Sequence, residues 1–120
     1  MILGHVRDLF PFVILNLLEH SGPTAVEFVI DTGFDGELAL PSSVLQHLDA
    51  TLIGNRIVIL ADKTPRRNSH YLVQVDWDGE IRSVEAVEMD GRPLLGNEMI
   101  EGSLLQVEMT DGGEVSIEPL

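Results

Sequence analysis

Cysteine is absent from this chain of 120 residues. Its absence excludes a disulfide framework and any metal site built from thiolates, and it makes a reducing compartment acceptable. Basic residues are scarce, because seven Lys and Arg stand against twenty Asp and Glu, which gives a formal net charge of −13. Such a chain repels phosphate groups. We therefore expect neither nucleic acid nor a membrane as a partner.

Long apolar runs are also lacking. Residues 9–18 are apolar enough to resemble the core of a signal peptide, but Pro11 and Asn16 interrupt them, and the run is too short to span a bilayer. Cleavage near Ala25 would also remove a strand just before the main motif of the chain. We interpret residues 9–18 as a strand and expect a cytoplasmic protein.

The sequence contains no recognisable metal or cofactor motif. Its four histidines lack the i, i+4 spacing by which two ligands share one face of a helix: they are His5, His20, His47 and His70. No serine or cysteine nucleophile motif and no glycine-rich phosphate loop occurs. We therefore expect no metal and no cofactor.

What is present is a series of short apolar segments between turn signals. Asp-Gly pairs at residues 35–36, 78–79, 90–91 and 111–112 bound strand-like runs such as 25–30, 56–60 and 71–77. Frequent short strands predict an all-β sandwich or barrel. Two short helices are expected, one from Pro41 to about Leu48 and one that Asn97 caps and Gly102 ends. The length and the apolar fraction of 44% indicate a single domain, residues 1–120.

The most informative motif is an apolar strand that ends in Asp31-Thr32-Gly33. A carboxylate at the end of a buried strand costs free energy to desolvate, so it usually marks chemistry or a tight hydrogen-bond network. Glycine lets the backbone approach another segment closely. The simpler alternative is that Asp31 and Gly33 form an ordinary turn after a strand.

A second motif favours the chemical interpretation. About sixty residues after Asp31-Thr32-Gly33-Phe34, the chain reads Pro93-Leu94-Leu95-Gly96-Asn97. This ordered pair resembles the retropepsin-like aspartic proteases of clan AA, most closely their small bacterial and archaeal members. The resemblance implies a closed β-barrel of the acid-protease type. It also implies hydrolysis of peptides or unfolded proteins by a water molecule that paired aspartates activate.

The resemblance further implies a homodimer. The chain carries one Asp-Thr-Gly and is too short for a second lobe, so Asp31 of each copy would meet at a two-fold axis. Thr32 would hydrogen-bond across that axis, and Gly33 would lie along the substrate backbone. Further substrate-binding positions would be Asp35, Ala61, Asp62, Leu94 and Leu95. The C-terminal strand, residues 114–120, would join a sheet between the two copies.

The sequence departs from the retroviral pattern at several positions. Phe34 replaces a small residue, and Asn97 stands where the retroviral enzymes carry an arginine after the glycine. The expected flap, residues 62–69, lacks the usual glycine and contains three basic residues, Lys63, Arg66 and Arg67. One interpretation is that these basic residues are attracted to an acidic cleft or select acidic peptides. The simpler alternative is that they belong to a solvated hairpin loop. An alternative function is therefore a dimeric peptide-binding or scaffold module of the same fold, with weak or no catalysis.

Overall fold

A computed structural model describes residues 1–59 and 63–120 of the chain. Within these residues the chain forms ten strands: β1 (Ile2–Arg7), β2 (Phe10–Glu19), β3 (Gly22–Ile30), β4 (Leu38–Leu40), β5 (Thr51–Ile59), β6 (Pro65–Trp77), β7 (Glu80–Glu88), β8 (Leu94–Leu95), β9 (Ser103–Val107) and β10 (Glu114–Pro119). The described residues also form two short helices, α1 (Ser42–Leu45) and α2 (Asn97–Ile100). Ala61 and Asp62, two of the expected substrate-binding residues, lie outside the described residues.

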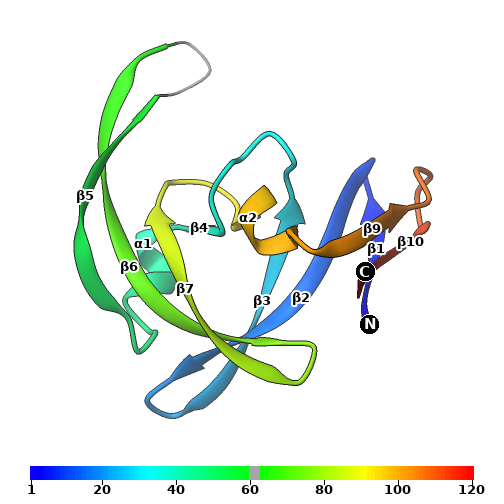
Figure 1. The fold of residues 1–120 in the computed structure, drawn as a ribbon, viewed down its shortest axis with the longest axis horizontal. Helices are drawn as coiled ribbons and strands as arrows, with labels where there is room; N and C mark the ends of the chain where they lie inside the picture. Colours follow the sequence, from blue (N-terminus) through cyan, green and yellow to red (C-terminus); the bar gives the residue numbers. More distant parts are fainter. Residues whose placement is uncertain (60–62) are drawn as a thin grey trace.

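The strands form one sheet that closes into a barrel (Figure 1). Their order is β5-β6-β7-β4-β8-β3-β2-β1-β10-β9, and β2 pairs additionally with β6, where Leu17 lies opposite Val75. This extra pairing closes a ring made of β2, β3, β8, β4, β7 and β6. The predicted all-β closed barrel with two short helices is thus confirmed.

The interior of the barrel is filled by apolar side chains. The largest of those that are fully buried include Phe28, Leu17, Leu38, Leu40 and Leu95. Burying one such side chain stabilises the fold by about 1.5–3 kcal/mol. Leu45 of α1 and Met99 of α2 belong to the same cluster. Since a helix of one turn is unstable by itself, this packing is what holds both helices in place.

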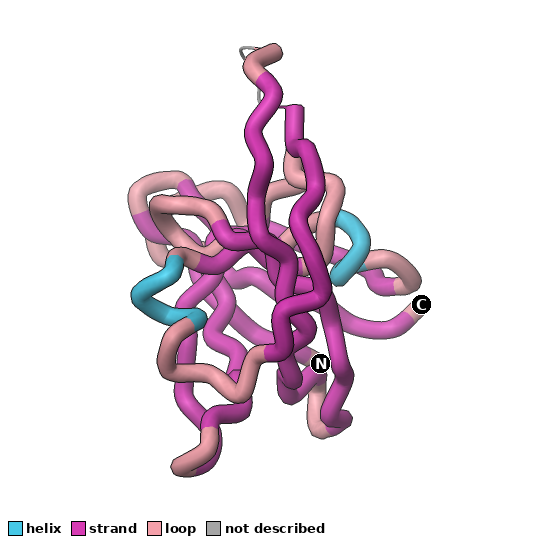
Figure 2. Tube along the Cα trace, turned by 90° about the vertical axis from the view of Figure 1, so that its left-hand side faces the viewer, coloured by secondary structure: helices cyan, strands magenta, loops and turns pink. Residues whose placement is uncertain are grey.

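β5 and β6 form a long hairpin that rises above the rest of the molecule (Figure 1, Figure 2). The end of β6 near Trp77 pairs with β7, whereas its beginning pairs with β5 up to Ile59 opposite Pro65. Residues 65–69 of the expected flap are therefore strand. Lys63 and Arg67, which lie near the end of this hairpin, are exposed.

The two helices begin and end close to where the sequence places them. α1 is continued by turn hydrogen bonds, the last from the Leu48 N–H to the Leu45 carbonyl oxygen at 3.1 Å. α2 ends before Gly102, as expected. Its N-cap residue, however, is Gly96, and no side chain caps it. The expectation that Asn97 caps α2 is therefore wrong, because the Asn97 side chain bonds to another loop.

β10 lies between β1 and β9, on the side of the molecule where the two termini meet (Figure 1). Ile117 lies opposite Ile2 of β1 and opposite Leu105 of β9. Both edges of β10 are thus hydrogen-bonded within one copy of the chain. The structure differs here from the expectation that residues 114–120 join a sheet between two copies. At this end of the sheet, the free edge belongs to β9.

This placement makes β10 a core strand, which gives the first prediction. Ile117 is 2% exposed, so Ile117→Ala is expected to lower the free energy of unfolding by about 2–5 kcal/mol, because the truncation leaves a cavity. Leu104 on the neighbouring strand β9 is 40% exposed, and Leu104→Ala is expected to cost about 1 kcal/mol or less. Urea denaturation measures both variants. Equal, small losses would contradict the position of β10 inside the fold.

Candidate active site

Asp31 follows the last residue of β3. Val29 and Ile30 are buried and pair in parallel with Leu94 and Leu95 of β8. The Asp31 N–H continues this ladder by donating to the Leu95 carbonyl oxygen at 2.9 Å. The buried strand therefore fixes the Asp31 backbone, while the residue as a whole remains half-buried.

Residues 31–37, which connect β3 to β4, form a loop that we call the Asp31 loop. The Gly33 N–H donates to Asp31 Oδ1 at 2.9 Å, and the Phe34 N–H donates to the Asp31 carbonyl oxygen at 3.1 Å. These bonds close a tight turn, as the simpler interpretation of the motif requires. They also leave Asp31 Oδ2 without a hydrogen bond from the described residues. One carboxylate oxygen is thus held by the loop, and the other is free to bind water or a partner.

The segment that leads into α2 supports the Asp31 loop. The Gly96 N–H donates to the Glu37 carbonyl oxygen at 2.9 Å, and the Asn97 N–H donates to the Phe34 carbonyl oxygen at 2.9 Å. A Cβ atom at Gly96 would lie 2.1 Å from the Gly36 carbonyl oxygen, so a side chain there forces the backbone to move. The two motifs, far apart in the sequence, therefore form one packed unit.

Asn97 has a role that the sequence did not indicate. Its Nδ2 donates to the Thr32 carbonyl oxygen at 2.7 Å. This bond ties the exposed backbone of Thr32 to the start of α2. No ion pair joins Asp35 to a basic residue among the described residues, so hydrogen bonds to the backbone hold the loop here.

The Asn97 amide gives a second prediction. Asn97→Asp keeps the shape of the side chain but removes the N–H group and places a carboxylate against the Thr32 carbonyl oxygen. We expect the free energy of unfolding to fall by about 0.5–1.5 kcal/mol. We also expect any activity that depends on the Asp31 loop to fall in the fully folded variant. Asn55→Asp is the matched control, because Asn55 Oδ1 accepts a bond from Ser69 Oγ and an aspartate can still accept it. Urea denaturation and rate measurements compare the two variants. If Asn97→Asp behaves like this control, the bond from Asn97 to the Thr32 carbonyl oxygen does not support the loop.

A cleft of about 410 Å³ lies between the Asp31 loop and the β5–β6 hairpin. Gly33 and Asp35 line it from the loop, and Ile57 and His70 line it from the hairpin. Glu98 of α2 also contributes to the wall. The cleft thus lies beside the Asp-Thr-Gly turn, and the exposed Gly33 forms part of its wall.

A second cavity, of about 330 Å³, is lined by Asp31 itself. Phe10 and Arg92 contribute to its wall, as does Leu94. Asp31 therefore lines this second cavity, whereas Gly33 and Asp35 of the same loop line the cleft.

The structure brings together most of the residues that the sequence selected. Gly33 and Asp35 line the cleft, and Asp31 and Leu94 line the second cavity. Thr32 is exposed between them. Leu95 is fully buried and supports Asp31 through its carbonyl group, so its role is structural rather than direct contact with a ligand.

The sequence missed an ionisable pair in the cleft. His70 Nδ1 lies 2.5 Å from Glu85 Oε1, and the Glu85 N–H donates to Glu37 Oε1 at 2.9 Å. These three residues are on β6, on β7 and in the Asp31 loop. The one available signal was the alternation along β7, which puts Glu85 on the same face as Val87. Nothing in the sequence connected that face to His70.

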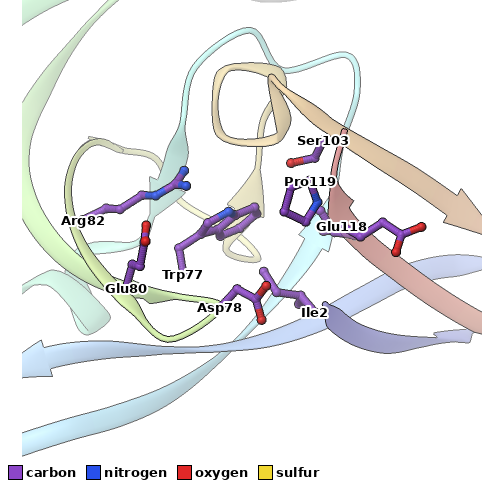
Figure 3. A pocket seen from close by; sticks show the side chains of 9 residues that line it. Ile2, Trp77, Asp78, Glu80, Arg82, Ser103, Glu118 and Pro119 are labelled. Carbon is purple, nitrogen blue, oxygen red and sulfur yellow. The ribbon is translucent and has the colours of Figure 1, made fainter.

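A third cavity, of about 150 Å³, lies at a different place (Figure 3). It is lined by residues of the β6–β7 turn and of the terminal strands, among them Trp77, Asp78 and Pro119. The Met1 amino group binds Asp78 Oδ2 at 2.7 Å, and the Arg82 guanidinium lies over the Trp77 ring. No residue of the Asp31 loop lines this cavity, so we assign it to packing near the chain ends.

Comparisons of the chain with family models, curated proteins and solved structures return no match. No helix in the described part of the chain is long and apolar enough to cross a membrane. Across residues 1–59 and 63–120, no three His, Asp or Glu side chains are grouped so that they could hold a metal ion. Evidence on function therefore comes from the geometry around Asp31.

Proposed function

We propose that the chain is an aspartic endopeptidase that acts as a homodimer, with Asp31 of each copy in one shared site. Its substrates are peptides or unfolded segments of protein that lie extended in the cleft beside Gly33. The reaction requires no metal and no cofactor. The proposed location is the cytoplasm, because a chain without cysteine loses nothing in a reducing compartment.

The observation that carries the proposal is the position of the Asp31 carboxylate. A buried strand and the Gly96 segment fix its backbone, and Gly33 fixes Oδ1. Oδ2 has no hydrogen bond from the described residues, Asp31 lines the cavity of about 330 Å³, and Gly33 of the same turn lines the cleft. A turn that only ends a strand needs no support from a distant segment, whereas the Asp31 loop is bonded to and closely packed against residues 96–97. This arrangement supports a carboxylate that is oriented for chemistry.

The proposed chemistry uses two carboxylates that share one proton. Two like charges a few ångströms apart do not both stay ionised, so one carboxyl keeps its proton. The ionised carboxylate takes a proton from water as the water oxygen attacks the peptide carbonyl carbon. The protonated carboxyl hydrogen-bonds the carbonyl oxygen and stabilises the charge that develops there. Proton transfer to the nitrogen then breaks the C–N bond of the tetrahedral intermediate.

The surroundings of Asp31 favour contact with a second copy there. The Arg92 guanidinium lies 5.3 Å from the centre of the Phe10 ring, beside the cavity that Asp31 lines. The Arg7 guanidinium lies 4.1 Å from the centre of the Phe12 ring. Arg92 and the exposed Phe10 ring therefore place positive charge and apolar area beside this cavity, whereas Arg7 covers a buried ring and is paired with Glu27. Positive charge at the contact reduces the repulsion between two acidic copies.

Arg7 also forms a two-bond ion pair with Glu27, at 2.6 and 3.2 Å. These hydrogen bonds hold the pKa of Glu27 below its ordinary value of 4.5. A lowered pKa means that the pair stabilises the fold above that ordinary value and that this contribution is lost as the pH falls through the lowered pKa. The pair therefore persists at mildly acidic pH, where a shared proton between carboxyls is easiest to keep.

The proposal is tested by measuring the cleavage rate of an unfolded protein substrate at about pH 5 and at about pH 8. We expect cleavage that is faster at the acidic pH, where protonation of one carboxyl is favoured and the charge repulsion between copies is weaker. A peptide in which a secondary alcohol replaces the scissile carbonyl is expected to inhibit, because it resembles the tetrahedral intermediate. A rate that rises steadily toward pH 8 would contradict the shared proton. Binding of the peptide without any cleavage would favour the scaffold alternative.

A further inference from the structure

The turn between β1 and β2 carries a leucine where its backbone favours glycine. Arg7 pairs with Phe10, so Asp8 and Leu9 form a two-residue turn. Both have positive φ, 52° for Asp8 and 64° for Leu9. This is the pattern of a type I′ turn, which prefers Asn-Gly or Asp-Gly because a bulky side chain at positive φ comes too close to the following carbonyl oxygen. Leu9 therefore keeps a strained backbone conformation.

The hairpin of β6 and β7 contains a turn of the same kind without this strain. Trp77 pairs with Glu80, and the two residues between them are Asp78 and Gly79, with φ of 54° and 93°. The second residue is therefore glycine in one turn and leucine in the other. Since glycine meets the backbone requirement without strain, the reason for a leucine in the β1–β2 turn lies in its side chain.

The Leu9 side chain does not serve the core of its own chain. It is 61% exposed, and Phe10 next to it is 47% exposed. Neither residue belongs to the buried apolar cluster or to the residues packed against it. Large apolar side chains that adjoin each other on the surface are typical of a site of contact with another molecule.

The turn is held in this exposed position by the connection between β9 and β10. The Leu9 N–H donates to Asp111 Oδ1 at 3.4 Å. The Gly112 N–H donates to the Val6 carbonyl oxygen at 2.8 Å, and the Val6 N–H donates to the Gly113 carbonyl oxygen at 2.9 Å. A surface that is fixed before binding loses little conformational freedom when it binds, so this support favours association.

The position of the turn favours a second copy as the partner. Phe10 lines the cavity of about 330 Å³ that Asp31 also lines, and the β1–β2 turn and the Asp31 loop both lie at the upper end of the barrel in Figure 1. A second copy that brings its own Asp31 to this place comes close to the turn. The Arg92 guanidinium, 5.3 Å from the centre of the Phe10 ring, adds positive charge that complements another copy with a net charge of −13.

We propose that the β1–β2 turn is a contact between two copies of the chain, in which Leu9 and Phe10 become buried. The inference rests on the proposed function for the place of this contact, because it takes the two Asp31 residues to meet beside the turn. Contact with the second copy removes the Leu9 side chain from water and offsets the strain that the turn carries in the free chain. In a two-fold contact, each copy contributes its own Leu9.

Sedimentation of variants at Leu9 measures this contact. Asparagine tolerates positive φ but lacks the apolar surface, so Leu9→Asn is expected to raise the dissociation constant of the dimer about tenfold to a hundredfold. Leu9→Met keeps the apolar surface and is expected to stay within about threefold of the wild type. Leu120→Asn is the matched control, because it removes a leucine that is 89% exposed at the C-terminal end, and it is expected to change nothing. Equal dissociation constants for Leu9→Asn and this control, or a wild type that is monomeric at every concentration, would overturn the inference.

The stability of the single chain separates a contact from a role in folding. The comparison uses a concentration at which the wild type is monomeric. There, Leu9→Asn is expected to unfold at the same urea concentration as the wild type or at a higher one, because asparagine relieves the strained φ. Unfolding at a clearly lower urea concentration would mean that Leu9 stabilises its own fold, and the inference would be abandoned.

The Asp31→Asn background separates this inference from the proposed function. These chains lack the proposed base, and their dimer is still expected to weaken when Leu9→Asn is added. That result supports the contact even if the wild type cleaves no peptide. If Leu9→Asn leaves the dimer of the active chain intact and instead raises KM for a peptide, the turn binds substrate. The inference is then wrong, while the proposed function stands.

Discussion

Asp31→Asn is expected to lower the rate of peptide cleavage by at least about a hundredfold, and by as much as about 10,000-fold. Asparagine has the shape of aspartate and can still accept the Gly33 N–H bond that fixes Oδ1. It does not take a proton from water, so the loop keeps its conformation while the reaction loses its base. The measurement is kcat/KM for a fluorogenic peptide, together with a denaturation curve that shows the fold unchanged.

The matched control is Asp90→Asn, the same chemical change in the exposed connection between β7 and β8. It is expected to retain the wild-type rate. Cleavage by Asp31→Asn at the rate of this control would show that the hydrolysis comes from another group or from a contaminating enzyme. The aspartic protease assignment would then be abandoned.

Gly96→Ala is expected to disrupt the same site through its packing. The added Cβ would lie 2.1 Å from the Gly36 carbonyl oxygen and 2.7 Å from the Phe34 carbonyl oxygen. Because both are backbone atoms, the Asp31 loop must move as a whole. We expect a loss of about 1–3 kcal/mol in the free energy of unfolding. We also expect a drop in kcat/KM of at least about a hundredfold, since small displacements of reacting groups are costly.

Gly113→Ala distinguishes misplacement of the site from general instability. A Cβ there would lie 1.9 Å from the Glu108 carbonyl oxygen, an equally severe conflict, but in the connection between β9 and β10. This variant is expected to lose comparable stability and to keep its activity under conditions where it is folded. Equal activities of the two folded variants would mean that the contact of Gly96 with the Asp31 loop has no functional role.

The sequence predicted where strands lie along the chain better than it predicted which strands pair with each other. Alternation and Asp-Gly turns correctly indicated strands at residues 25–30 and 71–77, which lie within β3 and β6. In β10, Val115 and Ile117 are buried, and Ser116 between them is buried as well, so both faces of this strand are covered. However, alternation fixes which face of a strand is buried and says nothing of which strand pairs with it. The expectation that residues 114–120 join a sheet between two copies came from the resemblance, and in the structure β10 pairs with β1 and β9 of the same copy.

The core of the candidate site could be expected only through the resemblance. β8 is two residues long, too short for any periodic signal, and its parallel pairing with β3 joins segments that are distant in sequence. The Leu94-Leu95-Gly96 motif placed it beside Asp31. The same resemblance did not foresee that Asn97 would donate to the Thr32 carbonyl oxygen, since its retroviral counterpart is an arginine.

The gathering of Glu37, Glu85 and Glu98 at the cleft could not be predicted from the sequence. Glu37, Glu85 and Glu98 are ordinary members of a chain with twenty acidic residues. They become distinctive because the closed barrel brings β7, the Asp31 loop and α2 to one cleft, next to a buried histidine. Charge patterning along the sequence does not contain that information.

The central claim, one site shared by two copies of Asp31, is tested most directly by mixing. A fixed amount of wild type is equilibrated with increasing Asp31→Asn, at a concentration where the protein is dimeric, and the cleavage rate is measured. Random exchange of subunits puts wild-type chains into mixed dimers that carry a single aspartate. An equal amount of Asp31→Asn is then expected to reduce the rate to about half, and a threefold excess to about a quarter. A rate that stays constant as Asp31→Asn is added, although exchange of subunits is demonstrated, would contradict the shared site.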